Sequence, residues 1–187
     1  REVTIARAKF TVTYPASFIL VASMNPSPTG YFTDPLSKMG PSPMEMQKYM
    51  GKISGPLLDR IDLHIEVEPV PFEQLADRQP AESSAAIRKR VNAARALQYK
   101  RFTNFPKTHY NTQMTTRQIR AFCELDAVSS NLLKQAMERL SLSARAYDRI
   151  LKVARTIADL EGGNQVVSSH IAEAIQYRSL DREGWMG

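Results

Sequence analysis

The sequence has a single cysteine, Cys123, among 187 residues, so neither an intrachain disulfide nor a cysteine-based zinc site can form. A lone thiol suits the reducing cytoplasm. No apolar run approaches the roughly 18 residues of a membrane-spanning helix, and the first residues lack the apolar segment of a signal peptide. The sequence therefore predicts a cytoplasmic protein without a membrane partner. Because the chain opens without an initiator methionine and inside a strand-like pattern, we expect a fragment of a larger protein.

Proline and glycine are missing from long parts of the chain. All 11 prolines lie at or before Pro106, and no glycine occurs between Gly55 and Gly162. This distribution predicts strands and loops in the front of the chain and helices in the back. The predicted fold class is α/β plus all-α. We expect four parts: the C-terminal part of an α/β core over 1–70, a linker and basic helix over 71–110, a four-helix domain over 111–178, and a tail over 179–187.

Three strand-like patterns precede the helices. Residues 2–14 alternate between apolar and polar side chains and can turn at 6–9, which predicts a β-hairpin with a basic tip. The continuous apolar run 17–24 predicts a strand buried on both faces, as in a parallel sheet. Residues 61–67 alternate and predict a strand with one solvated face. We expect the loop at 26–50, which holds five prolines and four methionines, to be mobile.

Helical periodicity begins at residue 82, and capping signals mark the helices. Ser83 and Ser84 are good N-caps for a helix with a strongly basic surface over 88–101. Thr115 with Gln118 resembles a capping box, and Ser143 can cap a later helix that Gly162 and Gly163 terminate. A last helix is expected after Ser168 or Ser169. These patterns predict a small bundle of amphipathic helices.

The common catalytic patterns are absent from the chain. There is no G-x-x-x-x-G-K-[ST] loop, so these residues cannot cradle a triphosphate by themselves. The three histidines have no ligand-like spacing, and we expect no metal site. The chain also contains no evident Ser/His/Asp set.

Three polar residues have positions that invite a functional interpretation. Asn25 closes an apolar strand, where it either forms an Asn-Pro turn or presents an amide at the carboxyl end of a sheet. Arg60, between a loop and a strand, either pairs with a neighbouring aspartate or reaches a phosphate on another molecule. Arg145 lies in the first turn of a helix, the unfavourable end for a cation, which hints at an anionic partner.

Basic side chains gather in two places, and the net charge is +6. Arg7 and Lys9 lie at the expected hairpin tip, and further lysines and arginines lie along 88–101. Either group can be a solvated face or a contact for nucleic acid.

Taken in order, these segments resemble the second half of a magnesium-chelatase-like AAA+ ATPase module. The resemblance rests on the segments 3–8, 14–22, 24–26, 53–64, 142–147 and 154–162. It is nearest to the YifB/ComM branch. It implies a partial AAA+ core, with a β-hairpin and parallel-sheet strands, followed by a small helical-bundle lid. It departs from relatives that carry closely spaced cysteines after the Asn-Pro, where this chain has Ser27 and Thr29.

The resemblance also assigns roles. It implies that residues 2–14 are a presensor hairpin lining a central pore, with Arg7 and Lys9 as nucleic-acid contacts. It makes Asn25 the sensor-1 residue that helps to orient the attacking water, and Arg60 the arginine finger donated to ATP in an adjacent subunit. Arg145 becomes sensor 2, which contacts the γ-phosphate. The Walker motifs would then lie upstream.

The implied function is that of an oligomeric ATPase that remodels nucleic acid. ATP and Mg²⁺ would bind to the full-length protein, in a homo-oligomeric ring expected to be a hexamer with DNA as its partner. We expect these 187 residues alone to bind no cofactor and to be inactive. Two alternatives remain open: the motor subunit of a magnesium chelatase that inserts metal into a porphyrin, and a non-enzymatic helical adaptor.

Overall fold

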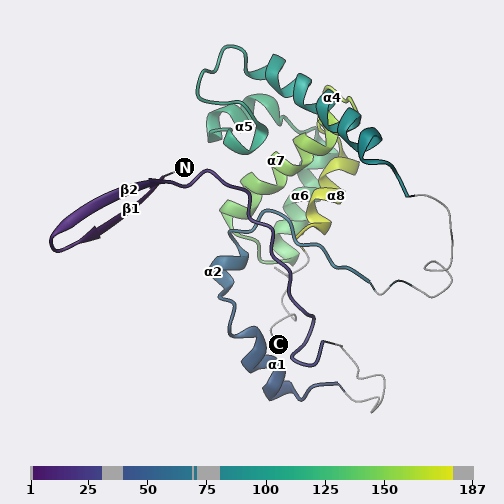
Figure 1. Ribbon diagram of the computed structural model, residues 1–187. Coiled ribbons are helices and arrows are strands. Elements are labelled where there is room, and N and C mark those ends of the chain that lie inside the picture. Colours follow the sequence, from purple (N-terminus) through teal and green to yellow (C-terminus); the bar gives the residue numbers. More distant parts are fainter. Residues whose placement is uncertain (1, 31–39, 69, 71–80, 179–187) are drawn as a thin grey trace. The chain divides into compact units, whose positions relative to one another are not determined.

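The computed structural model describes residues 2–30, 40–68, 70 and 81–178. The chain divides into two compact units, Arg1–Met50 and Gly51–Gly187. Within the described residues, the first unit carries the β-structure and the second carries a group of packed helices (Figure 1). A small β part followed by a helical bundle confirms the predicted fold class.

The first unit begins with the predicted β-hairpin. Strands β1 (Glu2–Arg7) and β2 (Phe10–Pro15) pair antiparallel, with Arg7 opposite Phe10. The turn is therefore only two residues long, shorter than the four-residue gap expected from the sequence. Because cross-strand partners share a face, the apolar residues of both strands lie on one face of the hairpin. Threonines lie on the other face, where the hydroxyls of Thr4 and Thr13 are 2.9 Å apart.

The two strands predicted at 17–24 and 61–67 are not formed in the described residues. Residues 17–24 adopt no strand, and the side chains of Ile19 and Val21 are 90% and 89% exposed. A strand is stable only when a neighbouring strand accepts and donates its backbone hydrogen bonds, and in the described ranges only β1 and β2 pair. The prediction for 61–67 is wrong for a different reason: backbone groups at Ile61 and His64 bond to the end of the last helix.

Two helices lie where a loop was expected. Helix α1 (Pro43–Met50) falls inside the stretch 26–50, so the prediction of a loop is wrong for that part, while residues 31–39 of the stretch lie outside the described residues. Its start is capped reciprocally, because the Glu45 carboxylate accepts from the Ser42 backbone N–H at 2.9 Å and the Ser42 hydroxyl accepts from Glu45 N–H. The second unit then opens with the short helix α2 (Gly55–Leu58).

The remaining helices of the second unit confirm most of the predicted caps. They are α4 (Ser84–Phe102), the 3₁₀ turn η1 (Asn111–Gln113), α5 (Thr116–Phe122), α6 (Ala127–Arg139), α7 (Ala144–Leu160) and α8 (Ser168–Gln176). The hydroxyls of Ser83, Thr115 and Ser143 each accept a backbone N–H. The predicted serine cap of α8 is wrong. Its N-cap is Val167, whose N–H donates to Nδ1 of His170 at 3.0 Å.

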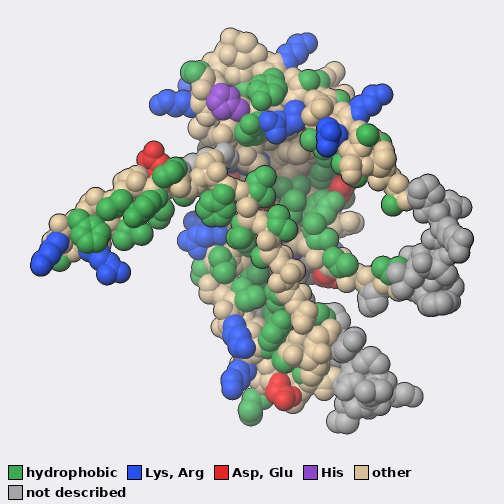
Figure 2. All heavy atoms as spheres, in the orientation of Figure 1, with side chains coloured by type: hydrophobic (Ala, Val, Ile, Leu, Met, Phe, Trp, Pro, Cys, Tyr) green, Lys and Arg blue, Asp and Glu red, His purple; other side chains and the backbone are tan. Residues whose placement is uncertain are grey.

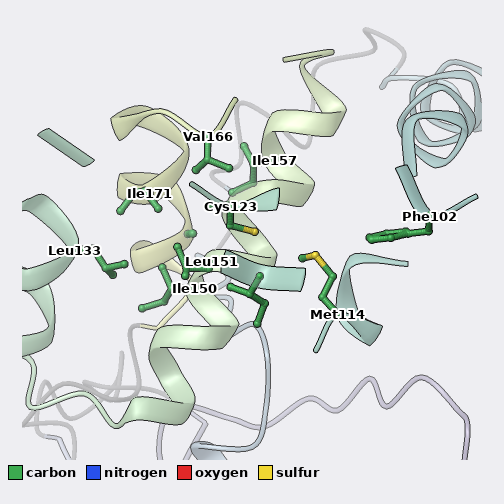
Figure 3. Packing of buried hydrophobic residues seen from close by; sticks show 12 residues of the cluster. Phe102, Met114, Cys123, Leu133, Ile150, Leu151, Ile157, Val166 and Ile171 are labelled. Atoms are coloured by element: carbon green, nitrogen blue, oxygen red, sulfur yellow. The ribbon is translucent and has the colours of Figure 1, made fainter. Parts of the chain in front are cut away.

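Helix α7 is the centre of the bundle. It packs against α4, α5 and α8, while α6 packs against α8. Its residues Ile150 and Leu151 are buried together with Leu133 of α6 and Ile171 of α8 (Figure 3). Cys123 is part of the same core, and burial raises the pKa of its thiol to about 11. The lone cysteine is therefore a packing residue rather than a nucleophile.

Candidate functional site

Asp59, directly after α2, holds the N-terminus of α7. Its carboxylate accepts a hydrogen bond from the Ser143 hydroxyl at 2.9 Å and from Nη1 of Arg145 at 3.0 Å. Nη2 of Arg178 lies 3.9 Å from the same carboxylate. We call these four residues the Asp59 junction. Burial acts to raise the pKa of Asp59, but the bonds from Ser143 and Arg145 and the charge of Arg178 together hold it below its usual value.

The junction explains how an arginine can occupy the first turn of a helix. A cation there is repelled by the positive end of the helix dipole. The carboxylate of Asp59 lies against both the helix end and the Arg145 guanidinium, so it offsets this cost. The Ser143 hydroxyl makes two hydrogen bonds: it accepts one from Ala146 N–H and donates one to the Asp59 carboxylate. The Arg145 side chain is still 54% exposed.

Arg60 follows the junction and is exposed. Its Nη1 donates to the carbonyl of Pro56 at 2.6 Å, across one turn of α2. The ion pair that sequence considerations allowed with a neighbouring aspartate is not formed, because Asp59 binds Arg145 and Asp62 binds Arg149 at 3.1 Å. Within the described residues Arg60 forms no ion pair, which leaves its guanidinium able to meet an anion from outside.

The segment carrying Arg60 is fixed to the helical bundle. Arg178, whose side chain is buried, donates to the carbonyl of Ile61, and the backbone N–H of His64 donates to the carbonyl of Tyr177 at 2.8 Å. Arg60 and Arg145 therefore belong to one compact unit, in which Arg60 follows Asp59 in the chain and Arg145 bonds to the Asp59 carboxylate. Sequence analysis missed Arg178, and no sequence signal could have paired it with a residue 117 positions away.

Asn25, Arg7 and Lys9 belong to the first unit. The carbonyl of Asn25 accepts from the Tyr49 hydroxyl at 2.8 Å, which ties the end of the 17–24 segment to α1. Arg7 ends β1 and Lys9 lies in the turn, and both side chains are exposed. Figure 2 shows basic side chains at the free end of the hairpin and apolar ones along it.

A second polar cluster, the Asp159 cluster, lies inside the bundle. The carboxylate of Asp159 accepts from Arg101, from Arg155 Nε at 3.1 Å and from Asn111 Nδ2 at 2.8 Å. Arg155 also donates to the carbonyls of Gly163 and Asn164, and so satisfies groups beyond the end of α7. These residues hold the bundle together. Nothing in the sequence alone indicated a separate role for Asp159.

No described helix is long and apolar enough to cross a membrane. No group of three or more His, Cys, Asp or Glu side chains in the described part could hold a metal ion.

Known proteins match the chain along nearly its whole length. A family model described as "Magnesium chelatase, subunit ChlI" matches residues 1–75, and one described as "Magnesium chelatase, subunit ChlI C-terminal" matches residues 81–178. The chain is 41% identical to Competence protein ComM of Haemophilus influenzae, over 97% of this chain and 34% of that protein. It is 39% identical to protein YifB of Escherichia coli, over 97% of this chain and 35% of that protein. It thus spans about a third of the length of these curated relatives.

Proposed function

The chain belongs to the magnesium-chelatase-like family, an AAA+ ATPase-like group, in its YifB/ComM branch, and we propose that it serves in an oligomeric motor that couples ATP hydrolysis to the remodelling of nucleic acid. In this proposal the 187 residues supply the arginines that act on the nucleotide and the hairpin that contacts the substrate. ATP and Mg²⁺ are bound by other residues of the whole protein, since this sequence has no phosphate-binding loop.

The observation that carries the proposal is that Arg60 directly follows Asp59 in the chain, while Arg145 donates a hydrogen bond to the Asp59 carboxylate. Both residues are exposed, and both belong to a unit in which the buried Arg178 side chain joins the Arg60 segment to the end of the last helix. Two cations so placed fit the γ-phosphate of a nucleotide, where charge develops in the transition state. Because an arginine finger serves the nucleotide of an adjacent subunit, we propose that Arg145 is presented to that same nucleotide.

Nucleic acid is the substrate that the exposed basic groups favour. Arg7 and Lys9 end a hairpin, and the net charge of the chain is +6. Neutralising phosphates with such side chains releases counterions and supplies affinity that does not depend on sequence. The alternative function is that of a motor subunit of a magnesium chelatase. The descriptions of the matching family models favour it, and it requires no contact between the hairpin and DNA.

Substitution of Arg60 in the whole protein tests the proposal. We expect Arg60→Ala to leave ATP binding nearly intact and to lower turnover by about 10³-fold or more, because the residue acts mainly in the transition state. Arg139→Ala, at an exposed arginine of α6 outside the site, is the matched control and should retain turnover. Mixing Arg60→Ala with a variant defective in its phosphate-binding loop should restore part of the activity.

Three results would count against the proposal. Loss of ATP affinity in a strictly monomeric Arg60→Ala protein would refute the action on a neighbour. Normal turnover by Arg60→Ala would refute the role of the residue. A whole wild-type protein that does not hydrolyse ATP would refute the motor itself and favour the non-enzymatic adaptor.

A further inference from the structure

Phe10 is an exposed aromatic residue between two cations. It opens β2, directly after Lys9 in the turn and opposite Arg7 in the register of the hairpin. Phe10 is 58% exposed. Because Arg7 and Phe10 are cross-strand partners, their side chains leave the same face of the hairpin. The register thus places the Phe10 and Arg7 side chains on one face at the tip, and Lys9 directly precedes Phe10 in the turn.

We propose that the hairpin tip binds single-stranded nucleic acid, with the Phe10 ring stacked on a base and with Arg7 and Lys9 on the flanking phosphates. This inference rests on the proposed function and names its substrate class. A base in a duplex already has both faces covered by its neighbours, whereas an unstacked base offers a free face to an aromatic ring. Cations bind the phosphates of a duplex as well as those of a single strand, so the ring is what would favour the single strand.

The local structure suits a stacking platform. The turn of Ala8 and Lys9 is only two residues long, and Ala8 contributes no more than a methyl group to it. The opposite face at this level carries Thr11, paired with Ala6. It offers no aromatic surface and no charge. The hairpin therefore has one face at its tip that can hold a base and one that cannot.

The test compares two probes on the whole protein: a thymidine single strand and a duplex with the same number of phosphates. Loss of one stacked base corresponds to about 5-fold to 140-fold in affinity. We expect Phe10→Ala and Phe10→Leu to weaken single-strand binding by at least 5-fold and duplex binding by less than 2-fold. Phe10→Leu keeps the apolar bulk and lacks the aromatic face, so it separates stacking from a packing role. Thr11→Ala, on the other face, should bind both probes as the wild type does.

A spectroscopic variant reports the contact directly. Phe10→Trp should retain single-strand binding, and the single strand should quench its fluorescence more than that of the unsubstituted protein. The slope of affinity against salt should stay the same in Phe10→Leu, because no phosphate contact is lost.

The outcomes separate this inference from the proposed function. Wild-type-like binding by Phe10→Leu, or equal losses on both probes, would overturn the stacking while leaving nucleic acid as the substrate. Binding of neither probe by the unsubstituted protein would overturn both proposals and favour a protein substrate.

Discussion

Replacing Asp159 tests what holds the helical bundle together. Its side chain has no exposed surface, and it accepts bonds from Arg101, Arg155 and Asn111. The Arg155 side chain is 1% exposed, and that of Arg101 is 14% exposed. In Asp159→Ala, two guanidiniums would remain in the interior without their carboxylate. Removing one partner of a buried ion pair costs about 3–5 kcal/mol, because an uncompensated buried charge is left behind.

That cost is a large part of the stability of a domain, which is about 5–15 kcal/mol in total. We therefore expect Asp159→Ala to lower the free energy of unfolding of the 187-residue chain by about 3 kcal/mol or more at pH 7. Denaturant titration followed by far-ultraviolet circular dichroism measures it. The control is Glu138→Ala, which breaks an exposed pair with Lys134 on α6 and should change stability by less than about 0.5 kcal/mol. A loss below about 1 kcal/mol in Asp159→Ala would refute the reasoning.

The pH dependence of the free energy of unfolding gives an independent test of the role of the Asp159 carboxylate. Burial acts to raise the pKa of Asp159, but hydrogen bonds from Arg101 and Asn111 and the charge of Arg155 hold it below its usual value. A carboxyl whose pKa is lowered on folding contributes stability above its unfolded pKa of about 3.9, and that contribution is lost as the pH falls through the folded pKa. The stability difference between wild type and Asp159→Asn should therefore be greatest near neutral pH and shrink below about pH 4.

Two further predictions concern the nucleotide and the substrate. The 187-residue chain alone should not hydrolyse ATP, because it has no phosphate-binding loop, and sustained phosphate release by a pure preparation would overturn this. In the whole protein, replacing Arg7 and Lys9 with alanine should reduce the slope of log affinity for DNA against log salt by roughly 1.4–1.8, which a salt series measures. Replacing Arg88 and Lys89 of α4 should change that slope little if their charges only face solvent, and an equal change in both double variants would argue against a contact at the hairpin tip.

The features that the sequence predicted correctly depend on interactions between residues that are close together in the sequence. A cap is made between residues three positions apart, as in Thr115 and Gln118, so residue type and spacing suffice to find it. The hairpin likewise follows from alternation within a dozen residues. Helix α1 could have been found in the same way, because Ser42 and Glu45 form a capping box, but the surrounding prolines favoured a loop.

The features that the sequence did not predict depend on distant partners. The apolar run 17–24 has the composition of a buried strand, yet composition does not supply the neighbour that a strand needs, and Ile19 and Val21 are exposed in the structure. Arg178 is bound to Ile61 across 117 positions, and Arg101 meets Asp159 across 58. Such pairs can be identified only when the packing of the helices is known.

Arg145 shows that a rule based on sequence can correctly indicate the need for an anion without identifying which anion is present. A cation in the first turn of α7 calls for an anion, and a phosphate was the candidate that the sequence suggested. In the structure Asp59, 86 positions earlier, already meets the need. The unfavourable helix end is therefore no longer an argument for a phosphate by itself. A γ-phosphate would instead have to compete with Asp59 for Arg145, and the exposed half of that side chain is what allows it to do so.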